Sequence, residues 1–345
     1  MDSKNVLFLA PPGLDIYKDV ITGLERLGYS VDYVSSSELP NNPFKPVFDN
    51  RYNEENVSAF EAECTHFWEK RFSEPYFSKS YDIFFSIDGL MVCPFLFDHL
   101  KNLNPNVKIK LFLYDKIEFA CHIERYLCYY DDVFSFDLGD VAKYNLRFLP
   151  IYWVPSNKKH EKRYDIFGMA TYSLHKKDRA KLFREIKTIV KKIGLKSFVR
   201  LYVKMDSWPV FLIKNFVKLL MRHKSYIPFI DVFNGLVTNK SLLPTEFRDY
   251  IYESEVIIDT HVEYQDGLTA RFMWALGAEK KIITTNKIVK EYVFYSPEQF
   301  FILGEDSFDR LADFVSTKFL MSEKNRKEVL KYRIDNWLET IINYN

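Results

Sequence analysis

The clearest chemical signal in the sequence is a glycine turn that leads into a helix near residue 267. Gly267 is followed by Leu268 and Thr269, where apolar residues at helical spacing begin. Backbone N–H groups at a helix start lack partners within the helix and lie at the positive end of its dipole, so they suit an anion such as a pyrophosphate. Arg271 stands in the first turn, where a cation is unfavourable unless an anion lies nearby. An ion pair with a neighbouring carboxylate is the alternative for Arg271.

A second set of candidates consists of carboxylates at the ends of expected strands. Asp88 follows the strand 82–87, Asp115 follows 109–114, and Asp137 follows 133–136. In open α/β sheets, ligands bind beyond the carboxyl ends of the strands, which is where these side chains would lie. The alternative is that each acid caps the helix after its strand.

Strands and helices alternate along the chain in two series, and these elements must position the candidates. The first series opens with the buried strand 6–10, and the second with the strand 164–168. Between them, residues 155–163 are polar and charged and form the best linker candidate. The final stretch, 307–343, is expected to be helical. We predict an α/β fold with two Rossmann-like domains facing a cleft, and a terminal helix that could return to the first domain.

Length and composition bound the class of protein. The 345 residues suit two domains, 1–156 and 157–345, the second counted with the terminal helix. A net charge of +1 predicts no nucleic-acid partner. The first apolar run is too short for a signal peptide, and none approaches the ~20 residues of a membrane span, so we expect a cytoplasmic protein. Four cysteines without C-x-x-C spacing predict no metal site.

One segment could bring the protein to a membrane. Residues 208–224 are basic and amphipathic, and such a helix could contact the anionic inner face of the cell membrane. A helix packed on the sheet of its own domain explains the pattern equally well.

Several motifs together resemble one group of bacterial enzymes. The longest runs Gln265-x-Gly267-Leu268-Thr269-x-Arg271, then Ala275-Leu276-Gly277 and Lys280-Lys281-Ile282-Ile283-Thr284-Thr285-Asn286, with Phe294-Tyr295 downstream. The first half adds Leu113-Tyr114-Asp115 and Phe134-Ser135-Phe136-Asp137 with Asp140. This set is similar to motifs of bacterial lipopolysaccharide and capsule glycosyltransferases, and it touches both expected domains.

The resemblance implies a glycosyltransferase of the GT-B type, which needs no metal ion, and the chain has no Asp-x-Asp triplet to hold one. Its substrates would be a nucleotide-sugar donor, bound by the domain 157–345, and a glycan or lipid-linked acceptor on the side of the domain 1–156, with no further cofactor. The residues expected at the donor are Gln265, Gly267, Leu268, Thr269, Arg271 and Lys204. For an inverting reaction, the base that deprotonates the acceptor would be Asp115, then Asp88, with His122 and Glu118 behind.

One position departs from this group. Trp274 stands where the related sequences carry a glutamate that holds the nucleotide ribose. We expect Trp274 to be a core residue, with a platform for the base as the alternative. Glu279 should lie at the helix end and is a poor substitute. Two other functions stay open on the same fold: a sugar-nucleotide 2-epimerase, and an inactive nucleotide-sugar-binding subunit of a polysaccharide assembly complex, which Trp274 favours.

Overall fold

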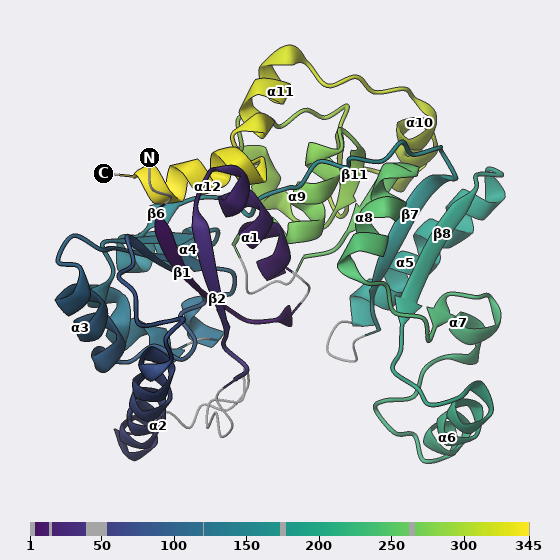
Figure 1. Ribbon diagram of the computed structural model, residues 1–345. Coiled ribbons are helices and arrows are strands. Elements are labelled where there is room, and N and C mark those ends of the chain that lie inside the picture. The colour runs from purple at the N-terminus through teal and green to yellow at the C-terminus, as the bar shows by residue number, and fades with distance from the viewer. Residues whose placement is uncertain are drawn as a thin grey trace. The chain divides into compact units, whose positions relative to one another are not determined.

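The chain forms two compact α/β units (Figure 1). The computed structural model describes residues 4–13, 16–38, 54–119, 121–172, 177–261 and 266–344, with the backbone alone at 54–56, 119, 121–122 and 177–178. The first unit comprises Met1–Val154, Glu263–Leu268 and Leu330–Asn345, and the second Pro155–Val262 and Thr269–Val329. Each unit is built on a parallel sheet with helices, which confirms the expected pair of Rossmann-like domains.

The first unit contains a six-stranded sheet in which all neighbouring strands are parallel. Its strands are β1 (Asn5–Ala10), β2 (Ser30–Ser35), β3 (Ile83–Ile87), β4 (Lys108–Leu113), β5 (Asp132–Ser135) and β6 (Arg147–Phe148). They lie in the order β2-β1-β3-β4-β5-β6, so the chain leaves β1 to one side for β2 and to the other for β3. Such a change of direction opens a crevice at the carboxyl ends of the central strands, where ligands of doubly wound sheets bind.

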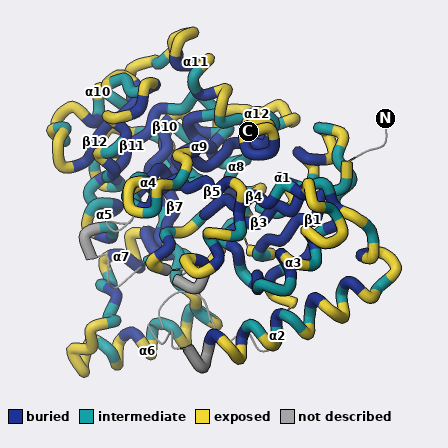
Figure 2. Tube along the Cα trace, turned by 90° about the vertical axis from the view of Figure 1, so that its left-hand side faces the viewer, coloured by how far each residue is buried: buried dark blue, intermediate teal, exposed yellow. Residues whose placement is uncertain are grey.

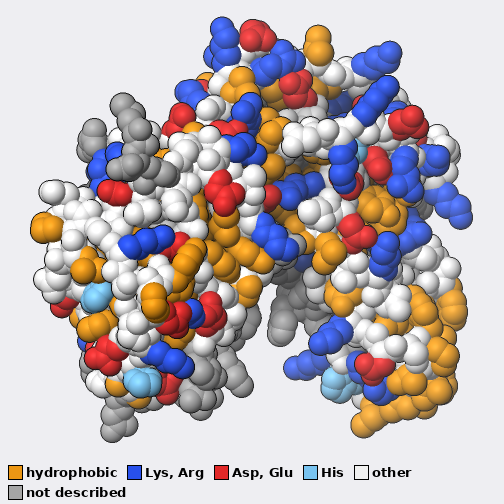
Figure 3. Space-filling model, in the orientation of Figure 1, with side chains coloured by type: hydrophobic (Ala, Val, Ile, Leu, Met, Phe, Trp, Pro, Cys, Tyr) orange, Lys and Arg blue, Asp and Glu red, His pale blue; other side chains and the backbone are white. Residues whose placement is uncertain are grey.

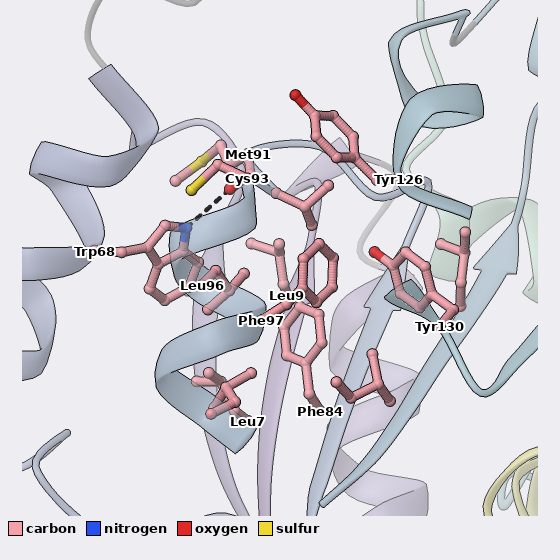
Figure 4. Close-up of a cluster of buried hydrophobic side chains, with 14 of the residues drawn as sticks. Leu7, Leu9, Trp68, Phe84, Met91, Cys93, Leu96, Phe97, Tyr126 and Tyr130 are labelled. Carbon is pink, nitrogen blue, oxygen red and sulfur yellow. Dashed lines mark hydrogen bonds between the residues drawn. The ribbon is translucent and has the colours of Figure 1, made fainter. Parts of the chain in front are cut away.

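Helices cover both faces of this sheet. They are α1 (Ile16–Arg26), α2 (Glu54–Ser73), α3 (Pro94–Leu103), α4 (Leu138–Tyr144) and α12 (Ile334–Asn343), with 3-10 turns η2 (Ile117–Phe119) and η3 (Cys121–Tyr129). Leu9 faces a core completed by α2 and α3, where Trp68 donates a hydrogen bond to a backbone carbonyl at 2.8 Å (Figure 4). Helix α12 packs on other residues of the strands: the ring of Trp337 lies edge-on to that of Phe112 of β4, with ring centroids 4.7 Å apart.

The second unit repeats this plan. Its strands are β7 (Tyr164–Thr171), β8 (Ser197–Tyr202), β9 (Val237–Thr238), β10 (Ser254–Asp259), β11 (Lys281–Thr284) and β12 (Phe300–Ile302). The helices are α5 (Lys177–Lys192), α6 (Trp208–Leu220), α7 (Phe229–Phe233), α8 (Pro244–Tyr252), α9 (Ala270–Gly277), α10 (Leu311–Ser316) and α11 (Glu323–Leu330). The parallel strands lie in the order β12-β11-β10-β7-β8-β9, so the change of direction falls between β7 and β10. Figure 2 shows these two strands largely in the dark blue of buried residues.

Three features differ from the sequence-based expectation. Helix α9 begins at Ala270, two residues later than expected. The stretch 307–343 is divided among α10, α11 and α12 rather than forming one helix. Residues from Leu330 onward pack with the first unit, so the terminal helix does return to it as the fold prediction allowed, although the expected domain boundaries counted it with the second domain. The loop expected at 39–53 lies outside the described residues.

We expect Trp337→Ala to destabilise the first unit by about 3–5 kcal/mol, the usual cost of removing a buried tryptophan. Trp337 has no exposed surface, and its Nε1 donates a hydrogen bond to the Pro150 carbonyl at 2.9 Å. The substitution would leave both a cavity and an unpaired carbonyl. Urea unfolding followed by circular dichroism measures the loss, with Leu320→Ala as the control because Leu320 is 84% exposed. Equal stability of the two variants would contradict the packing of α12.

Candidate active site

A pocket of about 220 Å³ opens at the change of direction in the first sheet, beyond the ends of β1, β3 and β4. It is lined by Ala10, Pro11, Gly13, Ile16, Ile87, Asp88, Tyr114 and Asp115. Most of this lining is apolar, and pockets with a few convergent polar groups are the usual sites of ligands. Asp88 and Asp115, two of the acids expected from strand ends, are therefore brought together in one pocket.

Asp88 has a backbone conformation that few residues other than glycine adopt. Its φ is 60°, and the following Gly89 has a φ of 56°. The turn is held by a hydrogen bond from the Asp88 N–H to the Phe112 carbonyl at 3.0 Å. Left-handed conformations of this kind are costly for a residue with a Cβ atom, and they cluster at functional sites.

The Asp88 carboxylate folds back over the end of β4. Its Oδ1 accepts hydrogen bonds from the N–H groups of Tyr114 at 2.6 Å and Asp115 at 3.2 Å. Burial raises the pKa of Asp88 and the negative charge of Asp115 raises it further, while the two N–H donors lower it. The resulting pKa is about 7, which lies in the range where a carboxylate can accept and release a proton at neutral pH.

The other candidate bases are placed differently. Asp115 stands two residues beyond the end of β4 and is exposed to solvent while lining the same pocket as Asp88. Glu118 is exposed and is not among the residues that line this pocket. The side chain of His122 lies outside the described part of the chain.

Asp137 and Asp140 hold local structure. Asp137 caps α4, and its Oδ1 accepts a hydrogen bond from the Asp140 N–H at 3.0 Å. Its Oδ2 accepts another from the Asp266 N–H at 2.6 Å. Asp140 accepts a hydrogen bond from the Ile117 N–H at 2.7 Å. Both acids are buried, so the capping alternative holds for Asp137.

The turn before α9 packs closely within the first unit. The Leu138 N–H donates a hydrogen bond to the Asp266 carbonyl at 3.1 Å. A Cβ atom at Gly267 would lie 2.4 Å from the backbone oxygen of Phe136, so only glycine fits there without a shift of the backbone. Leu268 is buried and offers no side chain to a ligand. Gln265 lies outside the described residues.

Thr269 and Arg271 share a buried carboxylate at the end of β10. The Thr269 hydroxyl caps α9 by accepting a hydrogen bond from the Phe272 N–H at 3.1 Å, and it donates one to Asp259 Oδ1 at 2.9 Å. Arg271 Nε lies 3.6 Å from the same oxygen, and its Nη1 donates a hydrogen bond to the Met169 carbonyl at 3.1 Å. Asp259 is thus the carboxylate partner that the sequence offered as the alternative to a bound anion for Arg271. The arginine side chain remains 29% exposed.

The end of β10 also carries buried polar atoms that sequence reasoning did not single out. Asp259 Oδ2 and Thr260 Oγ1 are buried and have no hydrogen-bond partner among the described residues. Buried polar atoms are nearly always paired, so such atoms indicate a place for a ligand or water. The available signal was that Asp259 ends a strand, as Asp88 does.

Three further residues considered at the donor are Lys204, Trp274 and Glu279. Lys204 follows β8 at an exposed position, and no described contact joins it to Thr269 or Arg271. Trp274 is 7% exposed and packs against Phe247 with ring centroids 6.3 Å apart, in agreement with its expected core role. Glu279 is held by Arg326 through hydrogen bonds of 2.7 and 2.9 Å.

Within the described residues, no three histidine, cysteine or acidic side chains come together as a metal site requires. No described helix is long and apolar enough to cross a membrane. The absence of a metal requirement therefore stays a prediction.

No known family model matches the chain, and neither does any curated protein. Solved structures match it over nearly its whole length. The α,α-trehalose 6-phosphate synthase of Burkholderia multivorans has a TM-score of 0.57 at 10% identity, over 99% of this chain and 98% of that one. The Escherichia coli trehalose-6-phosphate protein bound to UDP-2-fluoro glucose has a TM-score of 0.54 at 12% identity, over 99% and 98%.

A third match is a glycosyltransferase involved in avilamycin A biosynthesis, with a TM-score of 0.52 at 12% identity, over 99% of this chain and 96% of that one. At such identities the likeness concerns the arrangement of the chain alone. The chain has the two-unit GT-B fold that the sequence predicted.

Proposed function

We propose that the protein is a glycosyltransferase that moves a sugar from a nucleotide-sugar donor to a glycan or lipid-linked acceptor in surface polysaccharide biosynthesis. The observation that carries this proposal is the pocket at the switch point of the first sheet, where Asp88 and Asp115 meet. The second sheet supports it with an anchored arginine and a helix start at its own switch point. The lipopolysaccharide or capsule pathway rests on the sequence motifs.

The donor half of the proposal depends on Arg271. A guanidinium has five N–H donors, so its bond to Met169 leaves others for a phosphate. The contacts to Met169 and Asp259 hold the side chain in one place, which reduces the entropy lost on binding. Together with the first N–H groups of α9, Arg271 would stabilise the negative charge that develops on the leaving diphosphate.

The acceptor half of the proposal depends on a carboxylate in the pocket of the first unit. We propose Asp88 as the proton acceptor and Asp115 as the charge that keeps its pKa near neutrality. In an inverting transfer, the acceptor oxygen attacks the anomeric carbon and the bond to the diphosphate breaks. The hydroxyl proton passes to the carboxylate, and the bond electrons leave with the nucleotide. Asp115, the first choice from sequence, is the alternative base.

A panel of nucleotide sugars tests the proposal. The purified chain is mixed with UDP-, GDP-, CMP- and dTDP-sugars, and nucleotide release and sugar products are followed by mass spectrometry. One nucleotide is expected to raise the melting temperature, because a ligand that binds the native state stabilises it. Release of that nucleotide, faster with acceptor, supports transfer. An epimerised donor without acceptor would indicate the 2-epimerase, and binding without turnover would indicate a non-catalytic subunit.

We expect turnover to survive excess EDTA. The cationic Arg271 and the helix start would supply the stabilisation that a metal ion gives in other transferases. Initial rates are compared before and after chelation and dialysis. Loss of activity with EDTA and its return with Mg²⁺ or Mn²⁺ would contradict the metal-free mechanism.

A further inference from the structure

An apolar surface is exposed on α6, the turn after it, and α7. We call it the α6 surface, and its members are Val210, Ile213, Phe216, Val217, Leu219, Leu220, Met221, Ile230 and Phe233. Their exposed fractions range from 39% at Leu219 to 75% at Phe233. Figure 3 shows orange side chains gathered at the lower right, where Figure 1 places α6 and α7.

The packing of α6 on its own unit accounts for a different set of residues. Trp208, Phe211 and Leu212 contact a small core formed with α7 and β9. Asn215 is buried: its Nδ2 donates a hydrogen bond to the Ile227 carbonyl at 2.8 Å, and its Oδ1 accepts one from the Ile227 N–H at 2.9 Å. One face of α6 therefore holds the helix on its own unit. Packing within the domain, the alternative to membrane contact, explains that face alone.

The opposite face repeats at helical spacing. Ile213, Phe216, Val217 and Leu220 are related by three or four residues, so they form one stripe. Single exposed apolar residues are common on soluble proteins, whereas contiguous apolar patches mark interaction sites. Leu320, which is 84% exposed outside this stripe, is an example of the single kind.

Most charges beside the α6 surface are positive: the exposed Asp206 precedes α6, and Asp231 of α7 is buried and paired with Arg184. From Ser207 to Ile230 the sequence contains no aspartate or glutamate, and its charged side chains are Lys214, Lys218, Arg222 and Lys224. The whole chain has a net charge of only +1, so this excess is local. An apolar stripe flanked by basic residues matches the boundary between lipid phosphates and acyl chains.

We propose that the α6 surface binds the face of a membrane that contains anionic phospholipids. The apolar stripe would enter the headgroup boundary, and the lysine and arginine side chains would contact lipid phosphates. A second copy of the chain fits less well, because a symmetric contact would bring the same basic residues together. The proposal rests on the proposed function for its purpose, since it would bring the enzyme to a lipid-linked acceptor, but the binding itself needs neither donor nor acceptor.

Co-sedimentation of the full chain with vesicles tests this surface. Phosphatidylcholine vesicles with phosphatidylglycerol are expected to bind roughly ten times more protein than phosphatidylcholine alone, and added salt should reduce the difference. Equal binding to both kinds of vesicle, or to neither, would overturn the proposal.

Paired variants locate the contact. Ile213→Ser with Leu220→Ser should lower binding to anionic vesicles by roughly tenfold or more, while Leu320→Ser leaves it unchanged. Lys214→Glu with Lys218→Glu should lower it by at least fivefold per charge, on the order expected for basic residues at an anionic surface. Lys318→Glu with Lys324→Glu is the matched control.

The remaining outcomes also decide the matter. Full binding by the Ile213/Leu220 variant would overturn the assignment to α6. Light scattering that shows dimers of the unmodified chain, lost in that variant and without vesicle binding, would mean that a second copy covers the surface. Vesicle binding by a chain that hydrolyses and transfers no nucleotide sugar would support the surface and refute the proposed activity, so the two failures are distinguishable.

Discussion

Replacing Arg271 by alanine is expected to lower turnover by roughly 10²–10³-fold, the usual cost of losing one donor to transition-state charge. The guanidinium is fixed by Met169 and Asp259 at the start of α9, so alanine removes a placed cation rather than a flexible one. The loss should fall on kcat more than on KM, because the charge on the diphosphate grows as the glycosidic bond breaks. Initial rates with the nucleotide sugar found by the melting screen measure both constants.

The design must separate lost catalysis from a stranded charge. Asp259 is only 1% exposed, and alanine at 271 leaves that carboxylate without its cation. The double variant Arg271→Ala with Asp259→Asn removes the unpaired charge, so it should recover melting temperature without recovering turnover. Arg271→Lys keeps the charge but loses the planar fork, and should recover only part of the rate.

A matched arginine on α11 of the same unit provides the control. Arg326 pairs with Glu279 just beyond the other end of α9, so Arg326→Ala removes a cation near the helix without touching its start. Its turnover should stay within a few-fold of the unmodified chain. Near-normal turnover of a folded Arg271→Ala chain would remove the donor-site assignment.

The acids at the strand ends show how far the sequence alone could locate the pocket of the first unit. Parallel strands place their carboxyl ends on one edge, so the pattern that selected Asp88 and Asp115 also placed them together. The same pattern selected Asp137, which is a buried cap. The following residues could have separated them: Asp137 is three positions before Asp140, a capping spacing, while Asp88 precedes a glycine in a left-handed turn.

Other features depend on contacts between distant parts of the chain, which a local pattern does not contain. From sequence, Gly267 is interpreted as part of a helix start whose free N–H groups suit a phosphate. The structure shows that glycine is needed at 267 because the backbone of Phe136 lies too close for a Cβ atom. Trp337 lies on an apolar helix stripe that requires a partner, but the stripe does not say which sheet supplies it. The pairing of Arg271 with Asp259 has the same origin, because β10 and α9 meet only after folding.

Asp88→Asn is expected to lower turnover by on the order of 10²-fold or more, because the amide keeps the size of the side chain but accepts no proton. Donor binding should change by no more than a few-fold, since the substitution lies in the pocket of the first unit. The unmodified enzyme should lose kcat/KM as the pH falls through about 7, where the Asp88 carboxylate becomes protonated. A pH–rate profile with a flat acidic limb would contradict this role.

Stability gives an independent readout of the same group. The pKa of Asp88 in the folded chain is above its ordinary value, so its contribution to stability is present at low pH and is lost as the pH rises to about 7 and beyond. Asparagine is neutral at every pH, and the melting temperature of Asp88→Asn relative to the unmodified chain should therefore rise between pH 5 and pH 8. A melting-temperature difference that stays constant from pH 5 to pH 8 would contradict the raised pKa of Asp88.

Asp115→Asn then decides which carboxylate takes the proton. If Asp88 is the base, removing the negative charge of Asp115 lowers the pKa of Asp88, and the acidic limb of the pH–rate profile moves to lower pH while the maximal rate changes modestly. If Asp115 is the base, the maximal rate of Asp115→Asn falls by on the order of 10²-fold and Asp88→Asn keeps most of its turnover. The two carboxylates share one pocket and one backbone turn, but a shifted limb and a lost plateau are different observations, and each assigns the proton to one of them.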